Sequence, residues 1–368
     1  RRASAIWLAA CCKKSTRYRV TRAYDATMDF QQNRSITTLH DLGLRTLDQK
    51  EAELRLYSGY RPMELVLPCL YSEITGPALE AIVEQLALAD YISHITIGLD
   101  KATKSEFEDA KRFFKKLKQP HTVIWNDGPR LTDLRQSLEN VGLEVGEQGK
   151  GRNVWTCIGH VISRGKAEVL AFHDCDILTY NRELIANLFL PLANPDFEFE
   201  FCKGYYPRIA NKKMNGRVAR LLVAPLLIAL EKTIGNSGYL QFMKSFKYPL
   251  SGEFSFRRNV LPELRISSDW GIEVGVLSEM QRNFSPNNIC QVDLADAYDH
   301  KHQDLSLNDE TKGLSKMSID IIKTFIKKLA TQGNSFSRET FRSLKATYYR
   351  SALDMIDIYR SDATMNGL

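Results

Sequence analysis

Between residues 61 and 180, short apolar runs alternate with longer stretches whose apolar residues recur at helical spacing. The runs predict strands, and the amphipathic stretches predict helices. Strands are expected at residues 64–68, 94–100, 122–126 and 169–176. Helices are expected at residues 76–89, 105–117, 130–141 and 152–163. This alternation predicts an α/β fold with a mainly parallel, Rossmann-like sheet, right-handed crossovers and helices on both faces.

The flanking regions follow other patterns. Residues 1–60 are polar, with scattered helical periodicity and no strand pattern, so we expect an N-terminal extension there. After residue 180 the alternation loosens, and further elements are expected as strands at 197–203, 253–257 and 289–293 and as helices at 218–234 and 271–280. From residue 315 the pattern is helical again, with a last helix expected over 341–359. We expect these C-terminal helices to pack on the core or against a second subunit.

Candidate ligand-binding residues follow the predicted strands. Ligands of parallel sheets bind beyond the carboxyl ends of the strands, where this chain has Pro68–Glu73, Asp100 and Asp174–Asp176. Asp174 and Asp176 are two residues apart, so in an extended segment their carboxylates face the same side. One or two carboxylates together with substrate phosphates are a common Mg²⁺ arrangement. The pair therefore predicts a metal site for a nucleotide-activated sugar, with helix capping by the aspartates as the alternative.

Residues elsewhere in the chain add to this hypothesis. Lys150 lies between two glycines at a predicted helix start, where backbone N–H groups and a cation favour a phosphate. His300 would complete a metal shell begun by Asp176. Glu253, at a turn into a strand, would grip sugar hydroxyls, and Gly216-Arg217 at a helix start would seat a phosphate or carboxylate. Lys150 and His300 are also compatible with ordinary surface loops.

Composition narrows the function classes. The net charge of +6 over 368 residues suits a small anionic substrate, and the short basic runs at 111–116 and 212–213 do not make the basic stripe of a nucleic-acid-binding protein. The cysteines are odd in number and lack metal-type spacing, so we expect reduced thiols in a cytoplasmic protein. No apolar stretch is long enough for a membrane span. Residues 1–11 superficially resemble a lipoprotein signal, but their apolar core is short, and we expect another kind of leader.

The order of these segments resembles the glucosyl-3-phosphoglycerate synthase family, retaining glycosyltransferases with a GT-A fold. The matching motifs lie between about residues 30 and 305: Gln32-Asn33-Arg34-Ser35, Leu67-Pro68-Cys69-Leu70-Tyr71-Ser72-Glu73, Gly149-Lys150-Gly151, Asp174-Cys175-Asp176, Asn215-Gly216-Arg217-Val218, Pro249-Leu250-Ser251-Gly252-Glu253, Gly271-Ile272-Glu273-Val274-Gly275 and the segment ending in His300. The chain departs from the family pattern at Cys69, Tyr71-Ser72, Ala219 and His302.

The resemblance implies a role for each matching residue. The nucleotide-sugar site would contain Pro68, Leu70, Glu73, Lys150, Asp174, Cys175 and Glu253. The acceptor site would contain Gly216, Arg217, Val218 and His302, and the metal ligands would be Asp176 and His300. Catalysis would depend on Asp176, Glu253 and Lys150. The chain would then comprise an N-terminal extension (1–60), a nucleotide-sugar-binding half (61–180), an acceptor-binding half (181–310) and a C-terminal helical extension (311–368).

The resemblance also implies an activity. A Mg²⁺- or Mn²⁺-dependent, cytoplasmic, homodimeric enzyme would transfer glucose from a nucleoside diphosphate glucose to 3-phosphoglycerate with retention, in the glucosylglycerate pathway. The residues provide no obvious nucleophile, and a front-face route needs none. One alternative is a sister transferase that uses another sugar or acceptor, such as mannose or glycerate. Another is a binding protein that keeps the fold without turnover, and a nucleic-acid-binding module is a more distant one.

Overall fold

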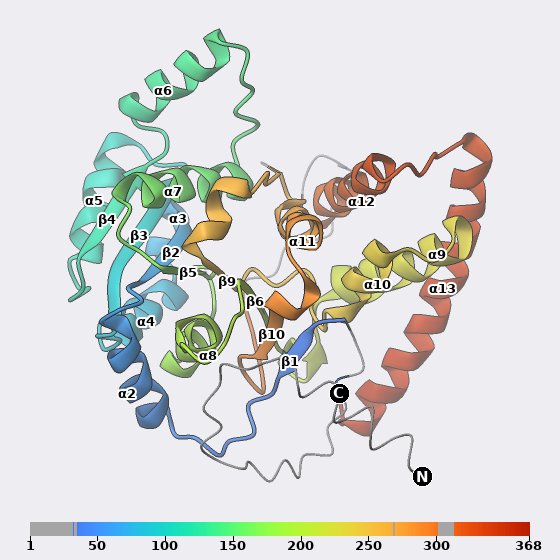
Figure 1. The fold of residues 1–368 in the computed structure, drawn as a ribbon, viewed down its shortest axis with the longest axis horizontal. Helices are drawn as coiled ribbons and strands as arrows, with labels where there is room; N and C mark the ends of the chain where they lie inside the picture. Colours follow the sequence, from blue (N-terminus) through green and yellow to red (C-terminus); the bar gives the residue numbers. More distant parts are fainter. Residues whose placement is uncertain (1–31, 33–34, 268, 301–312) are drawn as a thin grey trace, which may run out of the picture. The chain divides into compact units, whose positions relative to one another are not determined.

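A central sheet organises the part of the chain that the structure describes, residues 32, 35–267, 269–300 and 313–368 (Figure 1). In this computed structural model, eight of the described strands form the sheet in the order β1-β10-β6-β9-β5-β2-β3-β4. Neighbouring strands are parallel except at β9, which runs antiparallel to both β5 and β6. All described residues from Ser35 onward belong to one unit, residues 34–368.

The strands have the following bounds: β1 (Thr37–Leu39), β2 (Met63–Leu70), β3 (Ile92–Asp100), β4 (His121–Trp125), β5 (Val169–Phe172), β6 (Phe201–Tyr205), β9 (Phe254–Arg257) and β10 (Ile289–Asp293), with β7 (Ile209–Ala210) and β8 (Lys213–Met214) forming a separate ribbon. The α-helices are α2 (Leu47–Ser58), α3 (Tyr71–Ile74), α4 (Pro77–Leu86), α5 (Lys104–Phe114), α6 (Pro129–Asn140), α7 (Lys150–Arg164), α8 (Arg182–Ala193), α9 (Ala224–Ile234), α10 (Gly238–Ser245), α11 (Ile272–Asn283), α12 (Gly313–Thr331) and α13 (Arg338–Met365). A π-helical turn, η2 (Ala219–Val223), leads into α9, and two 3₁₀ turns are η3 (Arg258–Glu263) and η4 (Pro286–Asn288).

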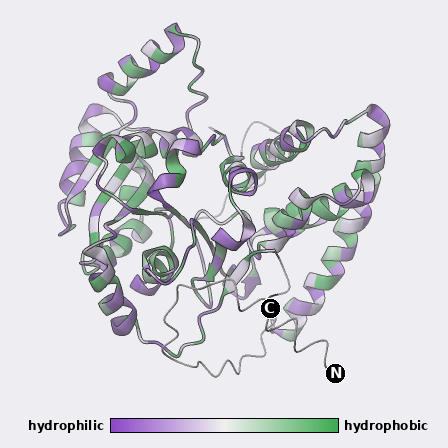
Figure 2. Cartoon of the chain, viewed as in Figure 1, coloured by the Kyte–Doolittle hydropathy of each residue, from purple (hydrophilic) through white to green (hydrophobic). Residues whose placement is uncertain are grey.

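Alternating strand residues build two apolar cores, one on each face of the sheet. In β5, Val169 and Ala171 join the core formed with α2, α4, α5 and α8, whereas Leu170 and Phe172 join the core formed with α7, α9, α10, α11 and α12. Successive side chains of a strand point to opposite faces, and strands covered on both faces are apolar throughout. Figure 2 accordingly shows largely hydrophobic central strands and more hydrophilic surface on α6.

Local signals explain where the helices of the first half begin and end. Thr103 accepts a hydrogen bond from the backbone N–H of Glu106, whose side chain bonds back to the N–H of Thr103, and this capping box starts α5. Helix α7 starts directly after Gly149 and ends at Gly165, which has a left-handed φ of 63°. The sequence prediction placed all eight elements of this half correctly, except that β5 ends at Phe172 and residues 173–176 form a loop.

Several elements were not predicted from the sequence, among them α2, α3 and the β7–β8 ribbon, and three more are informative. Strand β1, which lies in the predicted extension, pairs in parallel with β10, so the expectation of no strand before residue 60 was wrong. Helix α8 was not predicted because most of its residues are buried and it therefore has no polar face. Helix α10 was also missed. The leader predicted near the N-terminus lies outside the described residues.

The described helices include none that is long and apolar enough to cross a bilayer. The described cysteines, Cys69, Cys157, Cys175, Cys202 and Cys290, are all buried and unpaired. This agrees with the expectation of reduced thiols for these five residues.

Candidate active site

A cavity of about 910 Å³ lies at the carboxyl ends of the parallel strands β2, β3, β5 and β6. Because β9 is antiparallel, its beginning reaches the same edge and brings Gly252 to the cavity. The start of α7, the segment that leads into α11, and α12 also contribute lining residues.

Eleven of the predicted site residues line this cavity: Pro68, Leu70, Glu73, Lys150, Asp174, Cys175, Asp176, Gly216, Arg217, Val218 and His300. They come from five separate segments of the chain. Glu253 is not among the lining residues, and His302 lies outside the described part of the chain. The roles that the resemblance implies for them stay predictions, whereas their convergence is an observation.

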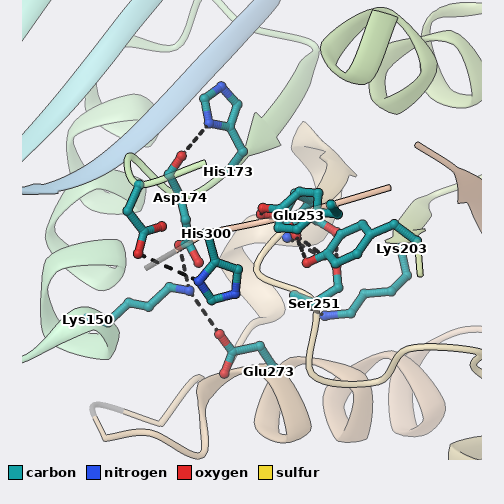
Figure 3. Close-up of polar contacts among 11 residues, drawn as sticks. Lys150, His173, Asp174, Lys203, Ser251, Glu253, Glu273 and His300 are labelled. Atoms are coloured by element: carbon teal, nitrogen blue, oxygen red, sulfur yellow. Dashed lines mark hydrogen bonds and ion pairs between the residues drawn. The ribbon is translucent and has the colours of Figure 1, made fainter. Parts of the chain in front are cut away.

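Lys150 connects two carboxylates at the floor of the cavity (Figure 3). Its Nζ lies 2.7 Å from Oδ1 of Asp174 and 3.1 Å from Oε1 of Glu273. Burial alone would lower the pKa of Lys150, but the two carboxylates raise it above its ordinary value. Burial would likewise raise the pKa of Asp174, yet Lys150 lowers it below the usual range. The group is therefore a charged carboxylate–ammonium–carboxylate cluster near neutral pH.

The backbone around Asp174 is fixed from two sides. The buried His173 ring donates from Nδ1 to the carbonyl oxygen of Asp174 at 2.8 Å, and burial lowers the pKa of His173, so the ring is neutral. On the other side, a Cβ at Gly252 would lie 2.6 Å from Oδ2 of Asp174 and 2.9 Å from Nζ of Lys150. Only glycine fits this close approach to the ion pair.

Asp176 and His300 face each other although they are far apart in sequence. Oδ2 of Asp176 lies 3.7 Å from Nδ1 of His300. Ile177 and His300 form an antiparallel bridge, and the N–H of Leu178 donates to the carbonyl of Asp299 at 2.8 Å, which brings the two segments together. Burial would lower the pKa of His300, but the Asp176 carboxylate raises it.

These two side chains fit a divalent cation. Oδ1 of Asp176 is buried and has no hydrogen-bond partner among the described residues, so it is available as a ligand. No group of three or more protein ligands occurs in the described ranges. A carboxylate together with substrate phosphate oxygens is a usual arrangement for Mg²⁺, and the His300 imidazole would add a nitrogen ligand.

Glu253 is fully buried beneath the cavity and is held by three hydroxyl groups. Tyr206 donates to its Oε2 at 2.5 Å, Tyr298 donates to its Oε1 at 2.6 Å, and Ser251 donates to Oε2 at 3.2 Å. Burial and the Glu253 charge raise the pKa of both tyrosines, which keeps them protonated as donors. The predicted contact of Glu253 with sugar hydroxyls stays a prediction, and the structure gives this carboxylate protein partners instead.

Besides Asp174, Glu273 on α11 is a carboxylate that lines the cavity and contacts Lys150. The sequence reasoning gave it no role, although it lies within one of the matching motifs. Tyr206 and Arg208, which follow β6, also line the cavity and were not predicted. Their position just after a parallel strand was the available signal, but the predicted strand ended at residue 203, whereas β6 ends at Tyr205.

Comparison with known proteins identifies the family. No family model matches the chain. The glucosyl-3-phosphoglycerate synthase of Persephonella marina is 44% identical over 340 residues, which cover 92% of this chain and 84% of that protein. The chain belongs to the glucosyl-3-phosphoglycerate synthase family. A second member of the family, from Methanococcoides burtonii, is 38% identical over 348 residues, 93% of this chain and 84% of that protein.

Solved structures of glucosyl-3-phosphoglycerate synthase share the fold. The Mycobacterium tuberculosis enzyme in complex with Mn²⁺, UDP-glucose and phosphoglyceric acid aligns with a TM-score of 0.57 and 22% identity, covering 80% of this chain and 88% of that chain. Another structure of that enzyme contains Mg²⁺ and UDP and aligns with a TM-score of 0.55. The predicted GT-A fold class, a mostly parallel sheet flanked by helices, is confirmed.

Proposed function

We propose that the protein transfers glucose from a nucleoside diphosphate glucose, with UDP-glucose as the first candidate, to 3-phosphoglycerate with retention. The observation that carries the proposal is the 44% identity to a glucosyl-3-phosphoglycerate synthase over 92% of the chain. The cavity supports it, because an acidic pair, a cation and a basic loop converge at the strand ends.

Each part of the cavity has a task in this proposal. Asp176 and His300 would hold Mg²⁺ or Mn²⁺, which neutralises charge on the departing diphosphate. Lys150 adds a fixed positive charge at the same place, and such preorganised charges typically contribute the largest catalytic effect. Pro68, Leu70 and Glu73 lie where the nucleotide would bind.

Glu273, rather than Glu253, is the carboxylate that we place against the donor sugar, because it is exposed to the cavity. Lys150 holds it at 3.1 Å and so fixes its orientation. Gly216, Arg217 and Val218 would form the acceptor loop at the opposite end of the same cavity lining. We further propose a homodimer in the cytoplasm, where the buried, unpaired cysteines would stay reduced.

A matrix of donors and acceptors tests the function. UDP-, ADP- and GDP-glucose and GDP-mannose are each incubated with 3-phosphoglycerate or glycerate, in Mg²⁺, Mn²⁺ or EDTA, and products are identified by mass. Glucosyl-3-phosphoglycerate should form only with metal. Asp176→Asn should lower the turnover by at least about 100-fold, whereas Asp133→Asn, on the exposed side of α6, should leave it unchanged. Product from mannose donors alone would favour the sister transferase, and full activity of Asp176→Asn would refute the metal role.

A further inference from the structure

Arg208 lies beside the predicted acceptor loop although it belongs to a different segment. Its carbonyl accepts the N–H of Asn215 at 2.6 Å, which closes the β7–β8 ribbon and brings Arg208 next to Gly216. A Cβ at Gly216 would lie 3.5 Å from Cδ of Arg208 and 3.2 Å from the hydroxyl of Tyr248. The left-handed φ of 79° at Gly216 and this crowding both require glycine, so the loop and the arginine form one packed surface.

The guanidinium of Arg208 is partly withdrawn from water and has no carboxylate partner among the described residues. Its Nε is buried and has no hydrogen-bond partner in the described ranges, where Arg208 also forms no ion pair. The hydroxyls of Tyr206, Tyr248 and Tyr298 face it, Tyr248 through a hydrogen bond, and the His300 ring also lies near it. Lys150, by contrast, has two carboxylates. A partly buried cation without an anion is unfavourable, so an anion that enters the cavity would complete this site.

The chemistry of the cavity indicates which anion this is. The acidic residues Asp174, Asp176 and Glu273 line the cavity from the β5 end and α11, whereas Arg208, Lys213 and Arg217 line it from the segment that carries the β7–β8 ribbon and Gly216. An anion is therefore favoured at the ribbon. The fork of a guanidinium matches the planar oxygens of a carboxylate or phosphate group better than an ammonium does.

We propose that Arg208 binds one of the two oxyanion groups of the acceptor, its carboxylate or its phosphate, and thereby selects anionic three-carbon acids. This inference rests on the proposed function. It adds to the acceptor loop a residue that lies outside every motif on which the family resemblance was based.

Substitution of Arg208 tests the proposal through the Michaelis constants of the two substrates. Arg208→Met should raise KM for 3-phosphoglycerate by roughly 10- to 100-fold, the range for losing hydrogen bonds to a charged group, while KM for the donor stays within about threefold. Arg208→Lys should show a smaller rise, because it keeps the charge and loses the fork. Lys212→Met removes one charge from the same ribbon, outside the cavity lining, and should change neither constant. Thermal melting checks that each variant folds, and Arg208→Lys serves if the methionine variant does not.

Truncated acceptors identify the group that Arg208 binds. Glycerate lacks the phosphate and glycerol 3-phosphate lacks the carboxylate, and their binding is followed by calorimetry as well as by product mass. The penalty of Arg208→Met should disappear with the compound that lacks the bound group. An acceptor KM within threefold of wild type in both Arg208 variants would overturn the proposal, as would an equal rise in the donor KM. Wild-type protein that binds 3-phosphoglycerate without transferring glucose would refute the proposed function and leave the Arg208 measurement intact.

Discussion

Glu253→Gln should destabilise the protein, because the carboxylate of Glu253 is fully buried and accepts three hydrogen bonds. A glutamine keeps one acceptor oxygen and places an amide donor against hydroxyls that already donate. Hydrogen bonds to charged groups are worth about 1.5–3 kcal/mol each, so the loss of one or two gives roughly 1.5–6 kcal/mol. The two shortest contacts, 2.5 Å and 2.6 Å, come from tyrosines, so these should dominate the effect.

Urea unfolding followed by circular dichroism measures this change. Tyr298→Phe removes one donor and should cost about 1.5–3 kcal/mol by itself. In the double variant with Glu253→Gln the losses should not add, because both changes remove the same hydrogen bond. Tyr349→Phe, on the exposed side of α13, serves as the control and should be neutral. Wild-type stability of Glu253→Gln, together with a large rise in donor KM, would refute this reasoning and return Glu253 to the donor sugar.

Two further predictions concern the surroundings of the same cluster. Burial lowers the pKa of Lys203 from 10.5 to about 8. Between these pH values the unfolded chain therefore holds a proton that the folded protein has released. The free energy of unfolding should rise with pH over this range, by up to about 3 kcal/mol relative to Lys203→Met. Parallel pH profiles of the two unfolding free energies would contradict this. Gly252→Ala should push Lys150 and Asp174 apart and lower kcat/KM by roughly tenfold or more, since overpacking costs about 1–3 kcal/mol. Gly159→Ala on α7, where a Cβ meets nothing within 4 Å, is its control, and equal activity of the two variants would show that the ion pair tolerates the displacement.

The sequence predicted best the elements that have a polar and an apolar side. Helices α4, α5 and α7 each carry a buried apolar stripe and agree with the expected ranges to within a few residues. Helix α8 is buried on most sides and contains Pro191, so its periodicity does not distinguish it from a buried strand. Strand β1 has only three residues, two of them threonine, and owes its conformation to the edge of β10. Tertiary contacts determine these two elements, so no local sequence pattern predicts them.

The same limit applies to the site. Asp174, Asp176 and Lys150 follow from where strands end and helices begin, and the structure brings them to one cavity. Glu273 comes from the first turn of α11, whose approach to Lys150 depends on how that helix packs over the sheet. Glu253 has the right residue type next to a strand, but the direction of its side chain depends on two tyrosines from other segments. Residue type and spacing therefore identify the carboxylates, and only packing decides which of them faces the substrate.

The antiparallel strand β9 explains how the buried cluster reaches the metal ligands. Because β9 begins at the edge where its neighbours end, the turn before it places Ser251, Gly252 and Glu253 beneath the cavity. Lys203 donates to the carbonyl of Ser251 at 2.6 Å and anchors this turn to β6. Glu253 in turn holds Tyr298, two residues before His300, and the backbone N–H of Tyr298 donates to Pro207 at 3.0 Å. His300 thus owes its position opposite Asp176 to a largely buried network, so we expect damage to Glu253 to displace His300 and weaken metal binding.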